Sequence, residues 1–130
     1  MVRILTLVLV AGLVLARPAA AQTAGYTATF HATWTAETHP TDYPPSPHFS
    51  GLVGGTHDST VVFWEPGQLA SLGMKRMAEW GSQTDLLAEV QSAIQAGQAH
   101  ETIADAPLWT VPGSTSVDLT VTPDFPLVTL

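Results

Sequence analysis

The chain has 130 residues, of which 11 are Asp or Glu and only 4 are Lys or Arg, and it contains no cysteine. This length suits one domain, and the acidic balance excludes nucleic acid as a partner because phosphates are bound by Lys and Arg. Without cysteine no disulfide can stabilise the fold, so a core, a bound ion or a partner chain must do so.

Residues 1–21 have the features of a secretory signal peptide. Arg3 is a single positive charge before a nearly continuous apolar segment at 4–16, and small residues lead up to Ala21. The apolar segment is shorter than the roughly 20 residues of a membrane-spanning helix. We therefore expect a secreted or periplasmic protein, cleaved near Ala21, in which 22–130 form one domain without a membrane span.

Residues 26–34 predict an amphipathic β-strand. Two sets of side chains alternate along it: Tyr26, Ala28, Phe30, Ala32 and Trp34 in one, Thr27, Thr29, His31 and Thr33 in the other. A period of two residues is that of a strand with one face on a core and one in water. We expect the threonine face to be the solvated one.

A polar turn around His39–Pro40 leads into Tyr43–His57, which we expect to be an ordered loop. Its prolines do not fit a helix interior or a central strand, and its glycines reach backbone angles that other residues rarely adopt. Ordered loops of this kind often shape a binding surface. The alternative is a stiff crossover between two sheets with no binding role.

The next two segments carry weaker patterns. Val61–Trp64 is a short apolar segment between turn residues, which favours a buried strand. Gln68–Trp80 has apolar residues at irregular helical steps, and Gly73 interrupts it, so we expect a frayed or broken helical turn. Trp80 is expected to pack on the sheet.

Residues 82–97 give the clearest helical pattern. Ser82 can cap the helix with Asp85 completing a capping box, and Gly97 is placed to end it. The apolar face comprises Leu86, Val90 and Ile94, bordered by Leu87. Such a short helix with one apolar face must dock on a sheet to persist.

Two strand-like segments complete the chain, Val117–Val121 and Phe125–Leu130. Asp118 and Asp124 flank the first of them and its exit loop, where oxygen ligands often hold a hard cation. With no third and fourth ligand in the pattern, the residues alone establish no site.

Four histidines allow a second hypothesis, a metal-dependent secreted enzyme. His39, His48 and His57 recur at equal spacing, with His31 upstream, and neutral imidazole is a common zinc ligand. The spacing matches no HExxH or similar motif, and no GxSxG nucleophile is present. The alternative is that these histidines form hydrogen bonds that hold a loop in place.

The order of these segments resembles the spondin N-terminal domain, the module of the F-spondin and mindin type that also occurs in bacterial secreted proteins. The resemblance runs from Tyr26 to Leu130 through HPTDYPPSPHFSGLVGGTH, LASLGMKRMAEWG, LLAEVQSAI, GSTSVDLTV and FPLVTL. The residues that carry the pattern are Trp34, Pro40, Tyr43, Pro44, His48, Phe49, Ser50, Gly54, His57, Trp64, Ser71, Gly73, Glu79 and Gly81.

The resemblance implies a mainly β fold, an antiparallel β-sandwich similar to C2 domains, with one or two short helices packed at the side. It also implies a non-catalytic recognition or adhesion module whose partner is an extracellular protein or matrix ligand. We further expect the sandwich to be incomplete, so that unpaired strands let the chain self-associate. A truncated remnant without independent function is the remaining alternative.

The resemblance also implies a calcium ion. Family members place one acidic ligand on the late strand and another in a PSPDWF-type motif, and this chain ends before that motif. Thr120 aligns with the strand ligand, while Asp118 lies two residues earlier on the same face. Asp118 and Thr120 are therefore expected to form an incomplete calcium site.

Overall fold

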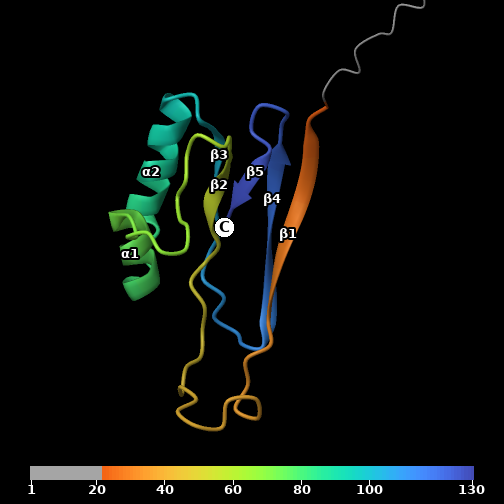
Figure 1. Ribbon diagram of the computed structural model, residues 1–130. Coiled ribbons are helices and arrows are strands. Elements are labelled where there is room, and N and C mark those ends of the chain that lie inside the picture. Colours follow the sequence, from red (N-terminus) through yellow and green to blue (C-terminus); the bar gives the residue numbers. More distant parts are fainter. Residues whose placement is uncertain (1–21) are drawn as a thin grey trace, which may run out of the picture.

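The structure, a computed structural model, describes residues 22–130 (Figure 1). The predicted signal peptide, residues 1–21, lies outside the described residues. The elements, in chain order within the described part, are β1 (Ala24–Ala32), β2 (Val53–His57), α1 (Leu72–Trp80), α2 (Thr84–Gln95), β3 (Ala99–Ala104), β4 (Gly113–Val121) and β5 (Leu127–Thr129). None of the helices in this range is long and apolar enough to cross a membrane.

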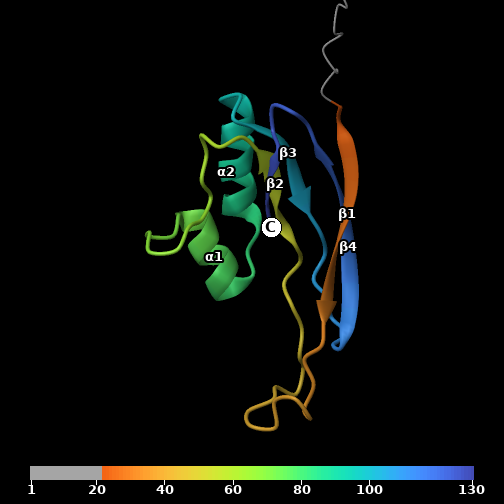
Figure 2. The ribbon, with the colours of Figure 1, turned by 45° about the vertical axis from the view of Figure 1, so that its right-hand side comes forward.

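The strands form two antiparallel sheets. One pairs β1 with β4, and the other has the strand order β3-β2-β5. Figures 1 and 2 show the two helices on one side of the three-stranded sheet and the β1-β4 sheet on its other side. The predicted mainly β architecture, two antiparallel sheets with helices at the side, is confirmed.

The alternation predicted for the first strand is present in β1 from Ala28 to Ala32, whereas Tyr26, predicted on the buried face, is 56 % exposed. Ala28 packs against the core between the sheets, whereas Thr27 and Thr29 are exposed. On the exposed face the Thr27 hydroxyl donates to Asp118 at 2.7 Å, and Thr29 shares a 2.9 Å hydrogen bond with Ser116. The strand ends at Ala32, so Trp34 lies in the following loop.

Two hydrophobic clusters hold the layers together. Between the sheets lie Ile103, Val117 and Leu119, and between the helices and the three-stranded sheet lie Phe63, Val90, Ala93 and Ala99. Strand β2 runs between these clusters, and all of its residues are buried. The middle sheet is thus covered on both faces.

The last third of the predicted loop is wrong, because Val53–His57 is the central strand β2 rather than a loop. Its glycines are required by close neighbours. A Cβ atom on Gly54 would lie 1.8 Å from the carbonyl oxygen of Thr129, and one on Gly55 would lie 2.5 Å from that of Glu101. Glycine weakens an isolated strand but admits a closely approaching backbone.

The strand predicted at Val61–Trp64 is also wrong. Both edges of β2 are taken, by β3 and by β5, so this segment has no strand to pair with. Phe63 is buried beneath α2, whereas Trp64 is 58 % exposed. Of the two strands that pair with β2, the sequence pattern did not predict β3.

Helix α1 is continuous rather than broken. The Ser71 hydroxyl caps it by accepting from the amide of Met74 at 3.1 Å, and Gly81, with φ of 66°, ends it. Gly73 belongs inside the helix because a Cβ atom there would lie 2.6 Å from the Cα atom of Leu86 in α2. Trp80 is 71 % exposed, so its predicted packing on the sheet is wrong.

Helix α2 has the predicted apolar face, with Leu86 and Val90 buried. Gly97, with φ of 73°, follows the end of the helix as expected. The predicted cap is wrong, because Gln83 occupies the N-cap and makes no side-chain hydrogen bond there. The Asp85 carboxylate instead accepts from Arg76 of α1 at 2.7 Å.

A carboxylate joins the two helices at the start of α1. Glu89 of α2 accepts from the Ser71 hydroxyl at 2.6 Å and from the Gly73 amide at 2.8 Å. The first amides of a helix have no partner inside it, so a carboxylate placed there stabilises the helix. Helix α1 is thereby joined to α2, and α2 packs against β2 and β3.

Candidate recognition surface

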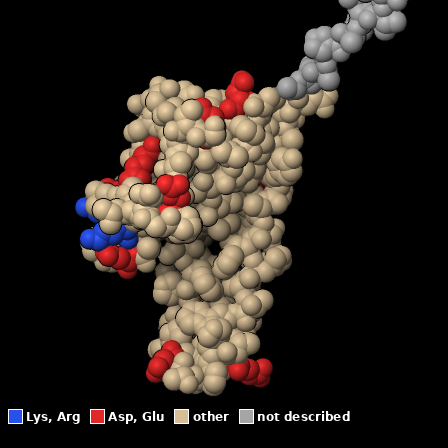
Figure 3. Space-filling model, in the orientation of Figure 1, with Lys and Arg blue, Asp and Glu red and all other residues tan. Residues whose placement is uncertain are grey.

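Residues 33–52 form a long loop between β1 and β2 that extends beyond the end of both sheets (Figures 1 and 2). Its end carries exposed acidic side chains, Glu37 and Asp42 (Figure 3). The two bases of residues 22–130, Lys75 and Arg76, lie on α1 instead. The loop is therefore the most prominent projecting feature of the described part, and it is acidic.

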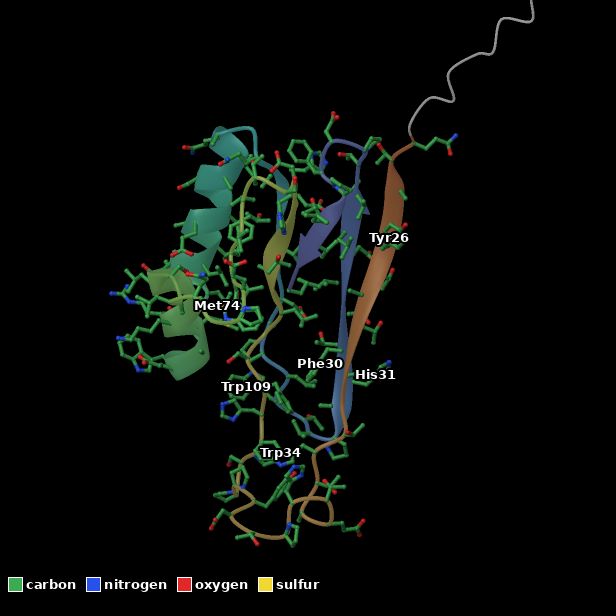
Figure 4. All side chains as sticks on the ribbon, viewed as in Figure 1. Tyr26, Phe30, His31, Trp34, Met74 and Trp109 are labelled. Atoms are coloured by element: carbon green, nitrogen blue, oxygen red, sulfur yellow. The ribbon has the colours of Figure 1, made fainter. Side chains whose placement is uncertain are left out.

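Aromatic side chains hold the base of this loop (Figure 4). The Trp34 ring lies edge to face with those of Tyr43 and Phe49, at centroid distances of 5.3 Å and 5.8 Å. Phe49 in turn contacts Phe30 of β1 at 5.1 Å. Each such pair contributes about 0.5–1.5 kcal/mol beyond area burial, so the loop is anchored to the sheet.

The part of the loop that leads back to β2 is hydrogen-bonded to the segment between β3 and β4. Phe49 and Leu108 exchange two backbone hydrogen bonds of 3.1 Å and 2.9 Å. This bridge brings Trp109 beside His48, with ring centroids 5.0 Å apart. Trp109 is 68 % exposed.

A shallow hollow surrounds this pair, lined by Pro45, Ser46, Pro47, His48, Trp109, Thr110 and Val111. We call it the His48–Trp109 surface. It combines an exposed indole, hydroxyl groups and prolines that restrict the backbone. Sequence reasoning missed Trp109, whose only signal was a lone tryptophan between Leu108 and Pro112 in an otherwise weakly patterned segment.

His57 lies in the core rather than at this surface. Its Nδ1 donates to the carbonyl oxygen of Asp58 at 2.7 Å, and in the neutral ring Nε2 accepts from the Thr129 hydroxyl at 2.9 Å. Both ring nitrogens are thus used to join β2 to β5 and to the following turn. This arrangement fits the structural role that was the alternative to metal binding.

The other histidines lie in separate surroundings. His31 is on the exposed face of β1 (Figure 4), His39 stands edge to face with Trp34, and His48 contacts Trp109. Across residues 22–130, no three His, Asp or Glu side chains form a group that could hold a metal ion. The structure therefore does not bring the zinc candidates together.

Asp118 and Thr120 of β4 line one hollow together with Thr27 of β1 and Glu101 of β3. The Asp118 carboxylate accepts from the Thr27 hydroxyl, and Glu101 accepts from the backbone amide of Thr120. Calcium takes 6–8 oxygen ligands, several of them carboxylates. The described residues supply two carboxylates here, which is only part of such a set, and Asp124 does not line the hollow.

Asp105 ties the end of β3 to β4. Its carboxylate accepts from the Thr115 hydroxyl and, at 2.8 Å, from the amide of Ala106. These hydrogen bonds, that of Thr115 first, hold the pKa of Asp105 below its ordinary value of 3.8.

A pH prediction follows for Asp105. Because the folded pKa is depressed, the stabilisation is fully present above the ordinary pKa of 3.8 and is lost as the pH falls through the folded value. We expect Asp105→Asn to lower the urea midpoint at neutral pH, and the difference from wild type to shrink below the ordinary pKa. A difference that stays constant from neutral to acid pH would contradict this assignment.

Comparison with known proteins identifies the family. The family model described as Spondin_N matches residues 24–130, which include every strand and helix of the described part. The chain belongs to the Spondin_N family. The resemblance inferred from the sequence motifs is thereby confirmed.

Individual relatives agree with this Spondin_N assignment. Spondin-1 of Rattus norvegicus is 43% identical over 70 residues, which is 53% of this chain and 9% of Spondin-1. Spondin-2 of Homo sapiens is 34% identical over 104 residues, which is 75% of this chain and 31% of Spondin-2. The chain thus spans a small part of the relatives that it matches.

The motif residues of this Spondin_N domain fall into distinct structural settings. Trp34, Tyr43 and Phe49 form the aromatic base of the loop, and His48 lies on the His48–Trp109 surface. Pro40, Pro44 and Ser50 lie in the loop, and Gly54 and His57 lie in β2. Ser71 caps the start of α1, Gly73 lies where α1 crosses α2, and Gly81 ends α1. Trp64 and Glu79 are exposed.

Proposed function

We propose that this Spondin_N domain is a secreted, non-catalytic recognition or adhesion module that binds an extracellular protein or matrix ligand through the His48–Trp109 surface. The observation that carries the proposal is the exposed indole of Trp109, whose ring centroid lies 5.0 Å from that of His48 in the projecting loop. Tryptophan is enriched among the residues that dominate binding energy at interfaces. An exposed tryptophan on a stiffened loop fits binding better than packing.

The surroundings of this surface favour a rigid contact. Prolines precede His48, the aromatic base fixes the loop to β1, and the Phe49–Leu108 bridge fixes Trp109. A surface that is ordered before binding loses less conformational entropy on association. Because Glu37 and Asp42 lie on the same loop, the expected partner is basic or neutral on its facing side.

The test is a binding measurement on the exposed tryptophan. We expect Trp109→Ala to weaken binding to immobilised extracellular matrix proteins or polysaccharides by roughly tenfold or more, measured by surface plasmon resonance. Trp80→Ala is the matched control, because Trp80 is 71 % exposed on α1 and does not line the His48–Trp109 surface. Equal affinity of the Trp109 variant and wild type, for a ligand that the wild type binds, would overturn the proposal.

We also propose that Asp118 and Thr120 bind calcium weakly, since only two carboxylates line their hollow. Calcium at a concentration equal to its Kd would stabilise the fold by about 0.4 kcal/mol, which raises the unfolding midpoint by roughly 2–3 °C. We expect millimolar calcium to produce a rise of this size, and Asp118→Asn to abolish it. Asp124→Asn, outside the hollow, should retain it, and an equal loss in both variants would contradict the assignment.

A further inference from the structure

A hollow of about 450 Å³ opens where β1 passes into the long loop. Figure 4 labels three of its residues at this place, Phe30, His31 and Trp34. The full lining is Phe30, His31, Ala32, Thr33, Trp34, His39 and Phe49, so it comes entirely from residues 30–49. None of these residues lines the hollow of the His48–Trp109 surface, and the proposed function does not use this second hollow as a binding site.

The aromatic rings of this hollow stand at steep angles to one another. The Trp34 ring makes an angle of 89° with the ring of His39 and 64° with that of Phe49. The rings of Phe49 and Phe30 meet at 70°. Two rings in an edge-to-face pair form a corner, so a ligand in that corner meets a face of each ring. The face of an aromatic ring carries the negative part of its quadrupole, which attracts a cation.

The charges of the described part also favour a cation. Residues 22–130 contain 11 acidic and two basic side chains, and both basic ones lie on α1. The exposed Glu37 lies in the turn that leads to His39, which is closed by a 2.9 Å hydrogen bond from the His39 amide to the carbonyl oxygen of Thr35. A field of this sign attracts cations to the hollow and repels anions.

The lining of the hollow restricts the kind of cation, because it contains no carboxylate. A primary ammonium or a guanidinium group brings several N–H donors, and here it would lose its hydration without gaining an ionic acceptor. A quaternary ammonium group has no N–H, and its charge is surrounded by apolar methyl groups that pack against ring faces. The chemistry of the lining thus selects one class of cation.

We propose that this hollow is a binding site for a quaternary ammonium group, held by the rings of Trp34, Phe30 and Phe49. The indole of Trp34 is its central wall, because it stands at a steep angle to two other lining rings and because tryptophan is the strongest cation–π partner among the aromatic side chains. A neutral group of the same shape would fill the volume but would gain nothing from the ring quadrupoles or from the acidic field. Recognition therefore depends on the charge of the ligand as well as on its shape.

The experiment titrates the purified protein with choline and, separately, with the tert-butyl analogue of choline, in which a carbon atom replaces the charged nitrogen. Mildly alkaline buffer keeps free imidazole uncharged. Nitrogen–proton correlation NMR follows the indole N–H signals, and the signal lost in Trp34→Phe identifies Trp34. We expect choline to shift the Trp34 signal with saturation and to bind roughly tenfold more tightly than the analogue. Equal binding of the two compounds, or no saturable shift at Trp34, would overturn the proposal.

Two substitutions locate the binding, measured by isothermal titration calorimetry. Trp34→Phe keeps a ring that can hold the base of the loop but is a weaker cation–π partner, so choline binding is expected to weaken by roughly three- to fivefold. Trp109→Phe is the matched control, because Trp109 does not line this hollow, and its affinity for choline should equal that of the wild type. Equal effects of the two variants, with unchanged urea midpoints, would overturn the assignment.

Vesicles of phosphatidylcholine identify the source of the quaternary ammonium group. Sedimentation of the protein with these vesicles, reversed by free choline, would support the proposal with a lipid headgroup as the ligand. Choline binding without vesicle binding would support it with a free ion as the ligand. Because the two hollows share no lining residue, failure of choline binding leaves the test of the His48–Trp109 surface unaffected.

Discussion

Gly54→Ala is expected to lower the free energy of unfolding by about 3 kcal/mol or more, because β5 cannot remain in place beside a side chain at this position. The added Cβ atom would lie 1.8 Å from the carbonyl oxygen of Thr129 and 2.8 Å from its carbonyl carbon. Both are backbone atoms, so no side-chain rotation can relieve the contact. Displacing Thr129 also breaks its hydrogen bond with His57.

The measurement is urea denaturation followed by tryptophan fluorescence, with Gly25→Ala as the matched control. Gly25 also lies in a strand, but a Cβ atom there would meet nothing within 4 Å. We expect the control to be neutral or slightly stabilising, because alanine restricts the unfolded chain more than glycine does. Similar midpoints for the two variants would show that β5 is not held against β2 as described.

Gly73→Ala is expected to destabilise the protein by about 1–3 kcal/mol, although alanine is the better helix former. The new methyl group would lie 2.6 Å from the Cα and the backbone nitrogen of Leu86, so the two helices would have to separate. Their separation also disturbs the hydrogen bond between the Gly73 amide and Glu89. Packing therefore outweighs intrinsic helix propensity at this position.

A second substitution in the same helix separates the two effects. Ala78 is exposed on α1, so Ala78→Gly should report the intrinsic propensity difference, about 1 kcal/mol, without a packing change. The cost of the helix contact is then the loss measured for Gly73→Ala plus this propensity difference. An increase in the urea midpoint of Gly73→Ala would contradict the close crossing of α1 and α2.

Parts of the candidate site could be read from the sequence, and parts could not. The loop with Tyr43 and His48 was expected to shape a surface because of its prolines and glycines. Trp109 was not found, since two backbone hydrogen bonds between Phe49 and Leu108 bring it to the loop from a distant segment. A backbone contact between residues far apart in the sequence leaves no local residue pattern from which it could be predicted.

The histidines illustrate the same limit. Equal spacing along the chain suggested that His39, His48 and His57 could share a metal ion. In the structure His57 is buried in β2, with its ring nitrogens bonded to Asp58 and Thr129, while His39 and His48 contact different tryptophans. Regular spacing brings side chains together only when it matches the period of the element that carries them.

The sequence alone determined the elements whose own side chains show a period, namely strands β1 and β4 and helix α2, together with the family. Tertiary structure decided the role of the glycines: Gly54 and Gly55 lie in a central strand, and Gly73 lies within a helix. The physical reason is that a glycine by itself favours neither strand nor helix, so the sequence around it does not show that another backbone packs against it. Its place is fixed by atoms that are distant along the chain.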